Sequence, residues 1–239
     1  MKPLFFFAAL LIAAHLQLKA QINTGNIIKN LTGPGGSSLT NDEIIKGLKE
    51  ALTIGSKNSS DKASQVDGFY KNPQIKIPFP EEAQQMEKTL NNMGMSQQTK
   101  EFVKALNRAA EDAAKKAAPI FADAIMKMTI TDGINIVKGS DDAATQYLKQ
   151  STSSPLKDAF KPVVKSSLQK VEITKYWNPL AKSYNKLPMV KKVNPDLDEY
   201  VTLKAMEGLF TLLAQEELKI RQDPMARTTD LLKKVFGGK

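Results

Sequence analysis

The sequence predicts an all-α protein with a single domain of about eight or nine helices. Apolar residues recur at helical spacing along most of the chain, and no convincing β-strand pattern accompanies them. The segment 67–80 carries three prolines and is the one place where a helix is disfavoured, because proline restricts itself and the residue before it. Neither a repeat of fixed period nor a second composition divides the chain, which favours one domain.

The first 20 residues have the pattern of a secretory signal peptide. Lys2 supplies a positive charge, an unbroken apolar run covers 4–14, and Ala20 is a small residue suited to cleavage. The run is too short for a membrane span, which needs about 20 apolar residues. We therefore expect cleavage after Ala20 and a periplasmic or secreted protein. Residues 21–38 have the turn-forming composition of a flexible Gly/Ser-containing leader, and 39–239 form the helical domain.

Local signals place the first helix and the strap that follows it. Thr40 and Glu43 form a capping box before an apolar stripe that reaches Leu52, and the helical pattern breaks after Gly55. The Pro-rich segment 67–80 then predicts an extended strap with one apolar side laid on the helices. Its alternating apolar residues are Ile75, Ile77 and Phe79.

Prolines, glycines and caps divide the rest of the chain. Pro80 starts a helix that ends at Gly94, and Ser96 opens a longer one that Pro119 breaks or kinks. The apolar stripe continues over 120–128, and two short helices follow over 131–138, closed by Gly139, and over 141–150. Ser154 and Pro155 cap the next helix. A strongly apolar helix is capped by Asn194 and Pro195 and ends at Asp223 and Pro224, and a last short helix runs from Thr229 to Phe236.

Composition removes several kinds of chemistry. The only histidine, His15, lies in the predicted signal peptide, and the chain has no cysteine. The cleaved protein therefore has no imidazole base, thiol nucleophile, disulfide or zinc site of nitrogen and sulfur ligands. An S-x-x-K match at Ser154 lacks its companion motifs, and the acids after Asn194 lack the glycine and the final glutamate of a calcium loop. We predict no catalytic residue, no metal and no cofactor.

The charge balance is basic but spread out. Lysines and arginines number 34 against 25 acids, for a formal charge of +9, and they are distributed along the whole chain. This pattern favours solvated helix faces, and we predict no nucleic-acid partner. The C-terminal segment 231–239 is short, amphipathic and basic, so peripheral membrane contact through it stands as an alternative to its docking on the core.

The three arginines are informative against 31 lysines, because arginine supplies a planar fork for bidentate contacts. Arg221 follows Glu216 and Glu217 at about one helical turn. We predict that these three side chains form a partly buried ion-pair cluster that ties the long helix to the last one. Arg108 and Arg227 are candidates either for ion pairs that fix the fold or for binding a carboxylate or phosphate.

Aromatic side chains supply the other candidates for a ligand site. We expect Tyr70, Trp177 and Tyr184 to line a pocket between helices, beneath the strap. The wider set of aromatics that could mark such a cavity also contains Phe69, Tyr147, Tyr176 and Tyr200.

Several longer strings resemble one bacterial family. They include Asp67-Gly-Phe-Tyr, Leu106-Asn-Arg-Ala-Ala-Glu111, Asp141-Asp-Ala-Ala-Thr-Gln-Tyr147 and, above all, Ala226-Arg-Thr-Thr-Asp-Leu-Leu-Lys-Lys-Val-Phe-Gly237. They resemble the bacterial domain-of-unknown-function family 4197, from about Leu39 to Gly237. The resemblance implies an exported, single-domain bacterial protein, and it implies no activity, cofactor or catalytic residue.

The leading hypothesis is a non-enzymatic envelope protein that binds a small or lipid-like ligand, or a partner protein, through a groove between helices. The first alternative is a hydrolase or lyase that uses a carboxylate with a tyrosine or lysine. It predicts acids, or an acid and a lysine, converging in a cleft with displaced pKa values. The second alternative is a structural tether in the cell envelope.

Overall fold

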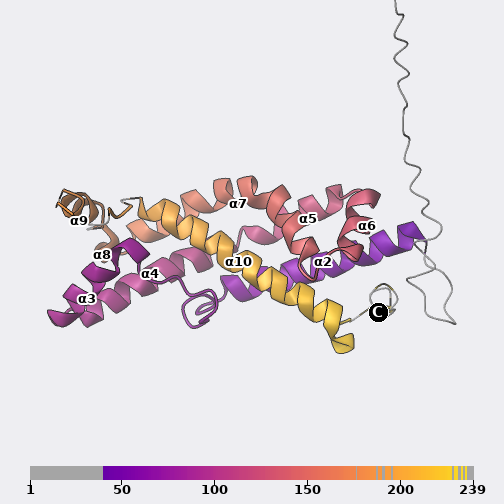
Figure 1. Cartoon of the computed structure of the whole chain (residues 1–239), viewed down its shortest axis with the longest axis horizontal. Coiled ribbons are helices and arrows are strands. Elements are labelled where there is room, and N and C mark those ends of the chain that lie inside the picture. The colour runs from indigo at the N-terminus through magenta and orange to yellow at the C-terminus, as the bar shows by residue number, and fades with distance from the viewer. Residues whose placement is uncertain are drawn as a thin grey trace, which may run out of the picture. The chain divides into compact units, whose positions relative to one another are not determined.

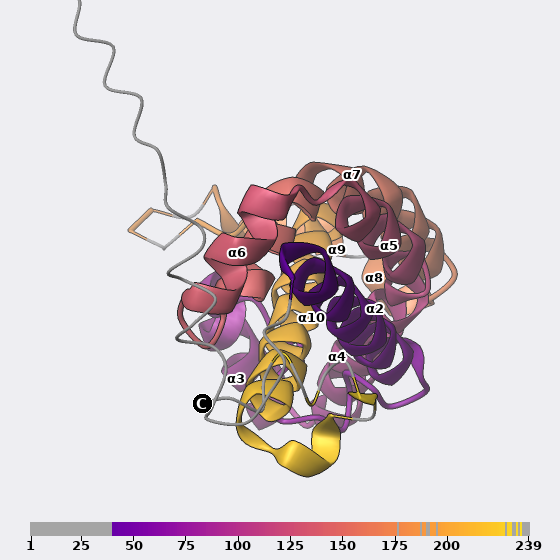
Figure 2. The same ribbon diagram turned by 90° about the vertical axis from the view of Figure 1, so that its right-hand side faces the viewer.

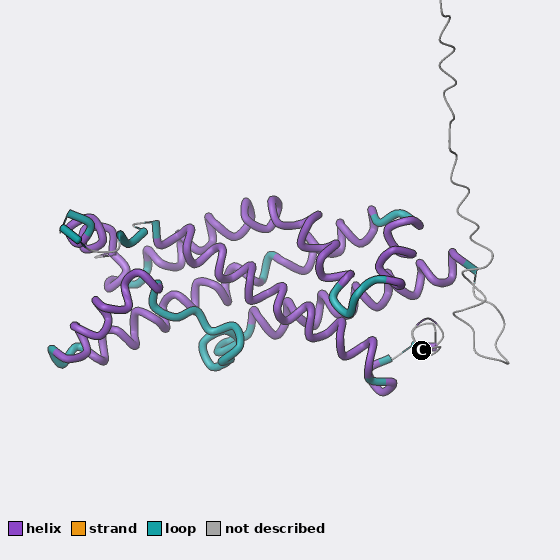
Figure 3. Tube along the Cα trace, in the orientation of Figure 1, coloured by secondary structure: helices purple, strands orange, loops and turns teal. Residues whose placement is uncertain are grey.

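The computed structural model describes residues 40–175, 177–186, 188–189, 192–194, 196–227, 229–230, 233 and 235. Within these ranges every regular element is helical (Figures 1 and 3), which confirms the all-α class. The elements are α2 (Asn41–Ser64), a 3-10 turn (Glu81–Ala83), α3 (Gln84–Asn92), α4 (Ser96–Ala114), α5 (Ala117–Lys127), α6 (Ile130–Lys138), α7 (Ala143–Gln169), α8 (Glu172–Lys175), α9 (Trp177–Tyr184), α10 (Leu197–Gln222) and a second 3-10 turn (Pro224–Ala226). The predicted signal peptide and leader lie outside the described residues.

The helix α2 begins as predicted but is longer than predicted. Glu43 donates its N–H to the Thr40 hydroxyl at 3.2 Å, and the Glu43 carboxylate accepts the N–H of Thr40 at 2.9 Å. The expected end after Gly55 is wrong, because α2 continues to Ser64. The hydroxyls of Ser59 and Ser60 are buried and donate to backbone carbonyls four residues earlier, each at 2.8 Å. Small polar residues can therefore lie on the buried face of this helix without leaving a polar group unpaired.

The predicted strap is present and its alternation is confirmed. Ile75, Ile77 and Phe79 are buried, whereas the residues between them are exposed. Asn107 of α4 holds the middle of the strap, since its Oδ1 accepts the N–H of Ile77 and its Nδ2 donates to the carbonyl of Ile77, both at 2.8 Å. One amide side chain thus replaces the two backbone bonds that a neighbouring strand would supply.

The strap also crosses α10 at very close range. A Cβ placed on Gly208 would lie 2.6 Å from the ring of Phe69 and 3.1 Å from the Cβ of Ile75. Gly208 is therefore required by the close approach of two segments and not by its backbone conformation.

Two predicted helix boundaries near prolines are wrong. The break between α4 and α5 falls at Lys115 and Lys116, and Pro119 lies in the first turn of α5, where no N–H is needed for an intrahelical bond. The helices expected over 141–150 and from Ser154 are one helix, α7, with Pro155 and Pro162 inside it. Both prolines are exposed, so the carbonyls that they leave unbonded can be hydrated. The opposite face continues unbroken through the buried residues Leu148, Thr152, Leu156, Phe160, Val164 and Leu168.

The N-cap of the long helix α10 lies two residues later than predicted. Asp196, not Asn194, accepts the N–H of Glu199 at 2.9 Å, and Asn194 instead accepts the N–H of Asp196. The predicted end of α10 at Asp223 and Pro224 is confirmed. The short helix predicted from Thr229 falls on residues that are only partly described.

The helices α7 and α10 organise the bundle. α10 packs against α2, α4 and α7, and α2 also contacts α5 and α6 (Figure 2). The helices α2, α5 and α6 gather toward one end of α7, whereas α3, α8 and α9 lie toward the other (Figure 1). In the part of the chain that the structure describes, no helix combines the length and apolarity needed to cross a bilayer.

Candidate functional site

The predicted cluster of Glu216, Glu217 and Arg221 is divided in the structure. Arg221 donates from Nε and Nη2 to Oε1 of Glu217 at 3.0 and 2.8 Å, and both side chains are 6 % exposed. The carboxylate of Glu217 also accepts the N–H of Ala144 and of Thr145, at 3.0 and 2.8 Å. These two residues open α7, so Glu217 neutralises the positive end of that helix.

Arg221 carries the connection to a further helix. Its Nη2 donates to the carbonyl of Ile136 in α6 at 2.9 Å. The buried pair of Glu217 and Arg221 therefore joins α10 to both α6 and α7, whereas the sequence had predicted a tie to the last helix.

Glu216 faces a different neighbour. It accepts hydrogen bonds from Lys62 and Asn58 of α2. Burial by itself raises the pKa of Glu216, but the hydrogen bonds from Lys62 and Asn58 outweigh it and hold the pKa below the ordinary value. The ion pair fastens α2 to α10.

Arg227 closes the C-terminal end of α10. Its Nε donates to the carbonyl of Ile220 at 3.0 Å and its Nη2 to the carbonyl of Arg221 at 2.8 Å. A helix leaves its last carbonyls without intrahelical partners, and the fork of Arg227 satisfies two of them.

Arg108 lies between two carboxylates at the base of the strap. Its Nη1 pairs with Glu111 and its Nη2 with Asp67, both at 2.5 Å. The hydrogen bond to Glu111 raises the pKa of Arg108. The other oxygen of Glu111 accepts the N–H of Phe69 and of Tyr70 at 3.1 and 3.2 Å. In this structure the guanidinium of Arg108 is occupied in fixing the start of the strap.

The ring of Tyr70 lies near Arg108, whereas Trp177 packs in a separate aromatic cluster. The guanidinium of Arg108 lies 6.0 Å, and the ammonium of Lys76 4.5 Å, from the centre of the Tyr70 ring. Trp177 packs with Phe79 and Phe102, with ring centres 5.9 and 5.3 Å away. The side chain of Tyr184 is not among those described. A ligand-binding role for Arg108, Arg227, Tyr70, Trp177 and Tyr184 stays a prediction.

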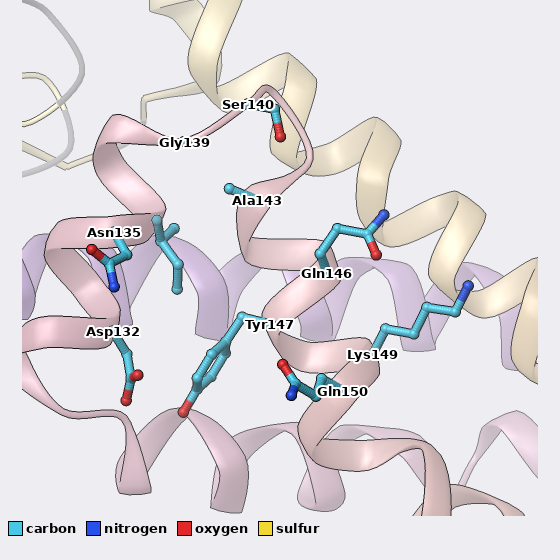
Figure 4. A pocket seen from close by; sticks show the side chains of 10 residues that line it. Asp132, Asn135, Gly139, Ser140, Ala143, Gln146, Tyr147, Lys149 and Gln150 are labelled. Atoms are coloured by element: carbon cyan, nitrogen blue, oxygen red, sulfur yellow. The ribbon is translucent and has the colours of Figure 1, made fainter.

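A groove of about 650 Å³ lies between α6 and the first half of α7, and we call it the α6–α7 groove (Figure 4). Figure 4 shows Asp132 of α6 on the same side of the groove mouth as the Tyr147 ring of α7, with Gln150 one turn further along α7 and Asn135 at the outer edge of α6. Ala143 contributes to the apolar part of the lining. The groove therefore combines a small apolar surface with polar side chains that come from two helices.

Several polar groups in this groove have no protein partner. Among the described residues, none bonds the hydroxyl of Tyr147 or the side-chain amides of Asn135 and Gln150. Burial raises the pKa of Tyr147, and the negative charge of Asp132 adds to this effect. Tyr147 is therefore protonated at neutral pH, and its hydroxyl can both donate and accept.

Tyr147 also lines a second hollow of about 500 Å³, on the α5 side of α7. Asp123 and Lys127 of α5 line that hollow and pair with each other at 2.7 Å. The Tyr147 side chain thus forms part of the wall of two neighbouring hollows.

The buried ion pair lies directly behind the α6–α7 groove. Ile136, whose carbonyl binds Arg221, is itself part of the lining. Thr145, which bonds Glu217, stands beside the lining residue Gln146. The pair of Glu217 and Arg221 therefore holds both walls of the groove in place.

A smaller cleft of about 260 Å³ lies at the other end of α7, between α8, α9 and the start of α10. Lys165, Trp177, Asp196 and Asp198 line it. Burial raises the pKa of Asp198, and the charge of Asp196 adds to it. No described group donates a hydrogen bond to the carboxylate of Asp198. An acid and a lysine thus share this cleft.

The sequence predictions included Tyr147 among the aromatics but missed Asn135 and Gln150. A usable signal existed, since Gly139 ends one short helix and the next begins a few residues later, which brings the two side by side. Gln146 and Gln150 stand four residues apart and so share one face of α7.

Comparison with protein-family models gives one match, to the family described as "Protein of unknown function (DUF4197)", over residues 38–237. No curated protein and no solved structure matches the chain.

Proposed function

We propose that this chain, which belongs to the DUF4197 family, is an exported, non-enzymatic binding protein whose α6–α7 groove holds a small polar ligand. The observation that carries the proposal is the set of unpartnered hydrogen-bonding groups on Tyr147, Asn135 and Gln150. Asn135 and Gln150 are exposed and Tyr147 is half-buried, so these groups are open to solvent and can bond a ligand. They line one groove from two helices.

The chemistry of the groove favours a ligand rich in hydroxyl or amide groups. Side-chain amides and the tyrosine hydroxyl each donate and accept, which suits partners that do the same. The ring of Tyr147 and Ala143 offer a short apolar surface for the flat face of such a molecule. A lipid chain needs a long enclosed apolar surface, so among the predicted ligands the small polar one fits this groove better.

The groove is better suited to binding than to acid–base catalysis. The carboxylate of Asp132 accepts the N–H and the hydroxyl of Thr129, at 2.9 and 2.7 Å. These hydrogen bonds lower the pKa of Asp132, which makes it a weak base. Tyr147, with its raised pKa, keeps its proton.

Native mass spectrometry of the processed protein, purified from the periplasm, tests the proposal. We expect an adduct of a polar small molecule, and we expect a variant with both Asn135→Leu and Tyr147→Phe to lose most of it. Tyr70→Phe is the matched control, since it removes a tyrosine hydroxyl at the strap and should retain the adduct. If the double variant retains the adduct and the control loses it, the ligand binds at the strap. That result would contradict ligand binding in the α6–α7 groove.

The export part of the proposal rests on the predicted signal peptide. Sequencing the N-terminus of the protein from periplasmic extracts should find Gln21 as the first residue. An intact Met1 in the mature protein would contradict export by this signal.

The hydrolase or lyase remains a second candidate because of one observation, the unpaired Asp198 beside Lys165. If this cleft is the working site, Asp198→Asn should abolish turnover of an ester or amide substrate panel while the protein stays folded. If neither the wild type nor Asp198→Asn turns over any substrate in that panel, this candidate fails.

A further inference from the structure

The unbalanced positive charge of the chain is concentrated in one segment. Residues 165–192 contain seven lysines and a single acid, Glu172, which gives +6 of the +9 of the whole sequence. The lysines themselves are spread along the chain, as predicted, but elsewhere acids nearly balance them. This segment contains the end of α7, the helices α8 and α9, and the loop after α9.

Four described lysines of this segment can meet an external partner. Lys175, Lys182, Lys186 and Lys192 are exposed, and none forms an ion pair with another described residue. Other exposed lysines of the protein do pair with acids about one helical turn away; they include Lys57, Lys115 and Lys127. Acids are few here: Asp196 and Asp198 share a cleft with Lys175, whereas Lys182, Lys186 and Lys192 line no described cleft with an acid. The excess of lysines over acids leaves a local positive field on this surface.

An exposed apolar side chain lies between Lys186 and Lys192 in the sequence, in the loop after α9. Met189 is fully exposed, at 105 %, and its backbone adopts a left-handed conformation with φ 61°. That conformation is unfavourable for a residue with a Cβ. Met93, 71 % exposed, projects from the turn after α3, at the same end of the bundle as α9 (Figure 1).

We propose that the surface formed by Lys175, Lys182, Lys186, Lys192 and Met189, which we call the α9 face, docks on a bilayer that contains anionic phospholipids. Clustered lysines are attracted to such a surface, and an isolated apolar side chain at a loop tip can enter the headgroup region. An acidic protein partner fits less well, since lysine is depleted in protein interfaces and Met189 is the only apolar residue among the five of the face.

This location differs from the C-terminal segment that the sequence suggested for membrane contact. Val235 of that segment is buried, and Lys233 pairs with Asp230 at 3.4 Å. The α9 face also lies away from the α6–α7 groove, so a polar ligand and a bilayer can be bound at the same time.

Co-sedimentation of the processed full chain with vesicles tests the α9 face. The vesicles are phosphatidylcholine with or without about a third of phosphatidylglycerol, at about 0.1 M salt, where charges within roughly 10 Å still interact. We expect binding only to the anionic vesicles. Each lysine contributes about fivefold to the partition coefficient, so exchanging all four for glutamine should lower it by about a hundredfold or more.

The matched control removes the same charge from other surfaces of the protein. Lys46, Lys116, Lys138 and Lys219 are exposed, and their joint exchange for glutamine should change binding less than about threefold. Equal losses in the two quadruple variants would overturn the proposal, because net charge alone would then explain binding. Circular dichroism checks that each variant is folded. If the quadruple variant unfolds, the double variants Lys175→Gln/Lys182→Gln and Lys186→Gln/Lys192→Gln take its place in the vesicle-binding comparison.

The variant Met189→Ser tests whether the partner of the α9 face is a bilayer or a soluble polyanion. If the methionine enters the headgroup region, we expect a drop of about threefold to tenfold in binding to the anionic vesicles. An unchanged partition coefficient for Met189→Ser, with loss for the lysine variant, would contradict docking on a bilayer and assign the face to a soluble acidic partner.

Discussion

The carboxylate of Glu217 on α10 accepts the backbone N–H of Thr145, in the first turn of α7, at 2.8 Å. The same carboxylate pairs with Arg221, which in turn holds the last turn of α6 through the carbonyl of Ile136. Because α6 and α7 are the two walls of the proposed ligand groove, the shape of the groove depends on an ion pair that a ligand need not touch. Stability and binding are therefore coupled at this place.

Glu217→Gln should strongly destabilise the fold. The change removes one partner of a buried, hydrogen-bonded ion pair, which costs about 3 kcal/mol or more. Chemical denaturation measures the loss. Lys57→Gln is the control, since it breaks an exposed pair with Asp61 and should cost less than about 1 kcal/mol. Equal losses in the two variants would show that the Glu217 pair does not have the structural role described.

Arg227→Lys should lower stability by about 1 kcal/mol, because a lysine ammonium cannot reproduce the two parallel bonds to the carbonyls of Ile220 and Arg221. The melting temperature reports this effect, and native mass spectrometry of the same sample reports ligand retention. A variant with both quantities unchanged would show that Arg227 contributes neither to the helix end nor to a ligand.

Gly208→Ala should destabilise the protein by about 1–3 kcal/mol, since the new methyl group would meet the Phe69 ring at 2.6 Å. Gly55→Ala is the matched control on α2. Its Cβ would find only ordinary contacts, 3.7 Å from Glu216 and 3.8 Å from Ile220, so alanine should be neutral or stabilising by up to about 1 kcal/mol. A Gly208→Ala protein as stable as Gly55→Ala would contradict the close crossing of strap and helix.

Tyr200 should make stability fall at high pH. Burial raises its pKa to about 12, and its hydroxyl donates to the carbonyl of Pro78 at 3.2 Å. An unfolded tyrosine titrates near 10, so between about pH 10 and 12 the unfolded chain releases a proton that the folded protein keeps. Stability therefore decreases as pH rises through that window, by up to about 2 kcal/mol. Urea unfolding measures the free energy of unfolding of the wild type and of Tyr200→Phe. The difference between the two free energies should narrow as the pH rises from about 10 to 12. A difference that stays constant over this range would contradict the raised pKa of Tyr200.

Much of the fold follows from local signals in the sequence. The capping box at Thr40, the alternation in the strap, and the ends at Gly139 and Pro224 are present in the structure. Each depends on neighbours within about one helical turn, so the sequence contains the necessary information.

Two of the wrong boundaries share one cause. The serines after Gly55 and the prolines within α7 weaken helices in isolation, yet both segments stay helical because each has a face buried against α10 and neighbouring helices. In α2 the serines Ser59 and Ser60 are themselves part of that buried face. Tertiary burial thus overrides local preference, and it can be known only once the packing partners are known.

The groove could be anticipated only in part. Tyr147 is visible as an aromatic residue, but whether Asn135 and Gln150 remain unpartnered depends on the angle between α6 and α7, which Glu217 and Arg221 set from a distant part of the chain. Long-range contacts of this kind leave no local pattern in a single sequence.

A titration followed by ¹H–¹⁵N NMR tests ligand binding in the α6–α7 groove most directly. The probes are a disaccharide, rich in hydroxyls, and an N-acetylated dipeptide amide, and the protein is the processed chain. We expect at least one probe to shift amide signals within residues 130–150, with Tyr147→Phe reducing the shifts and Tyr70→Phe leaving them unchanged. Shifts confined to the cleft at Asp198, or no saturable shift at all, would contradict the groove as the binding site.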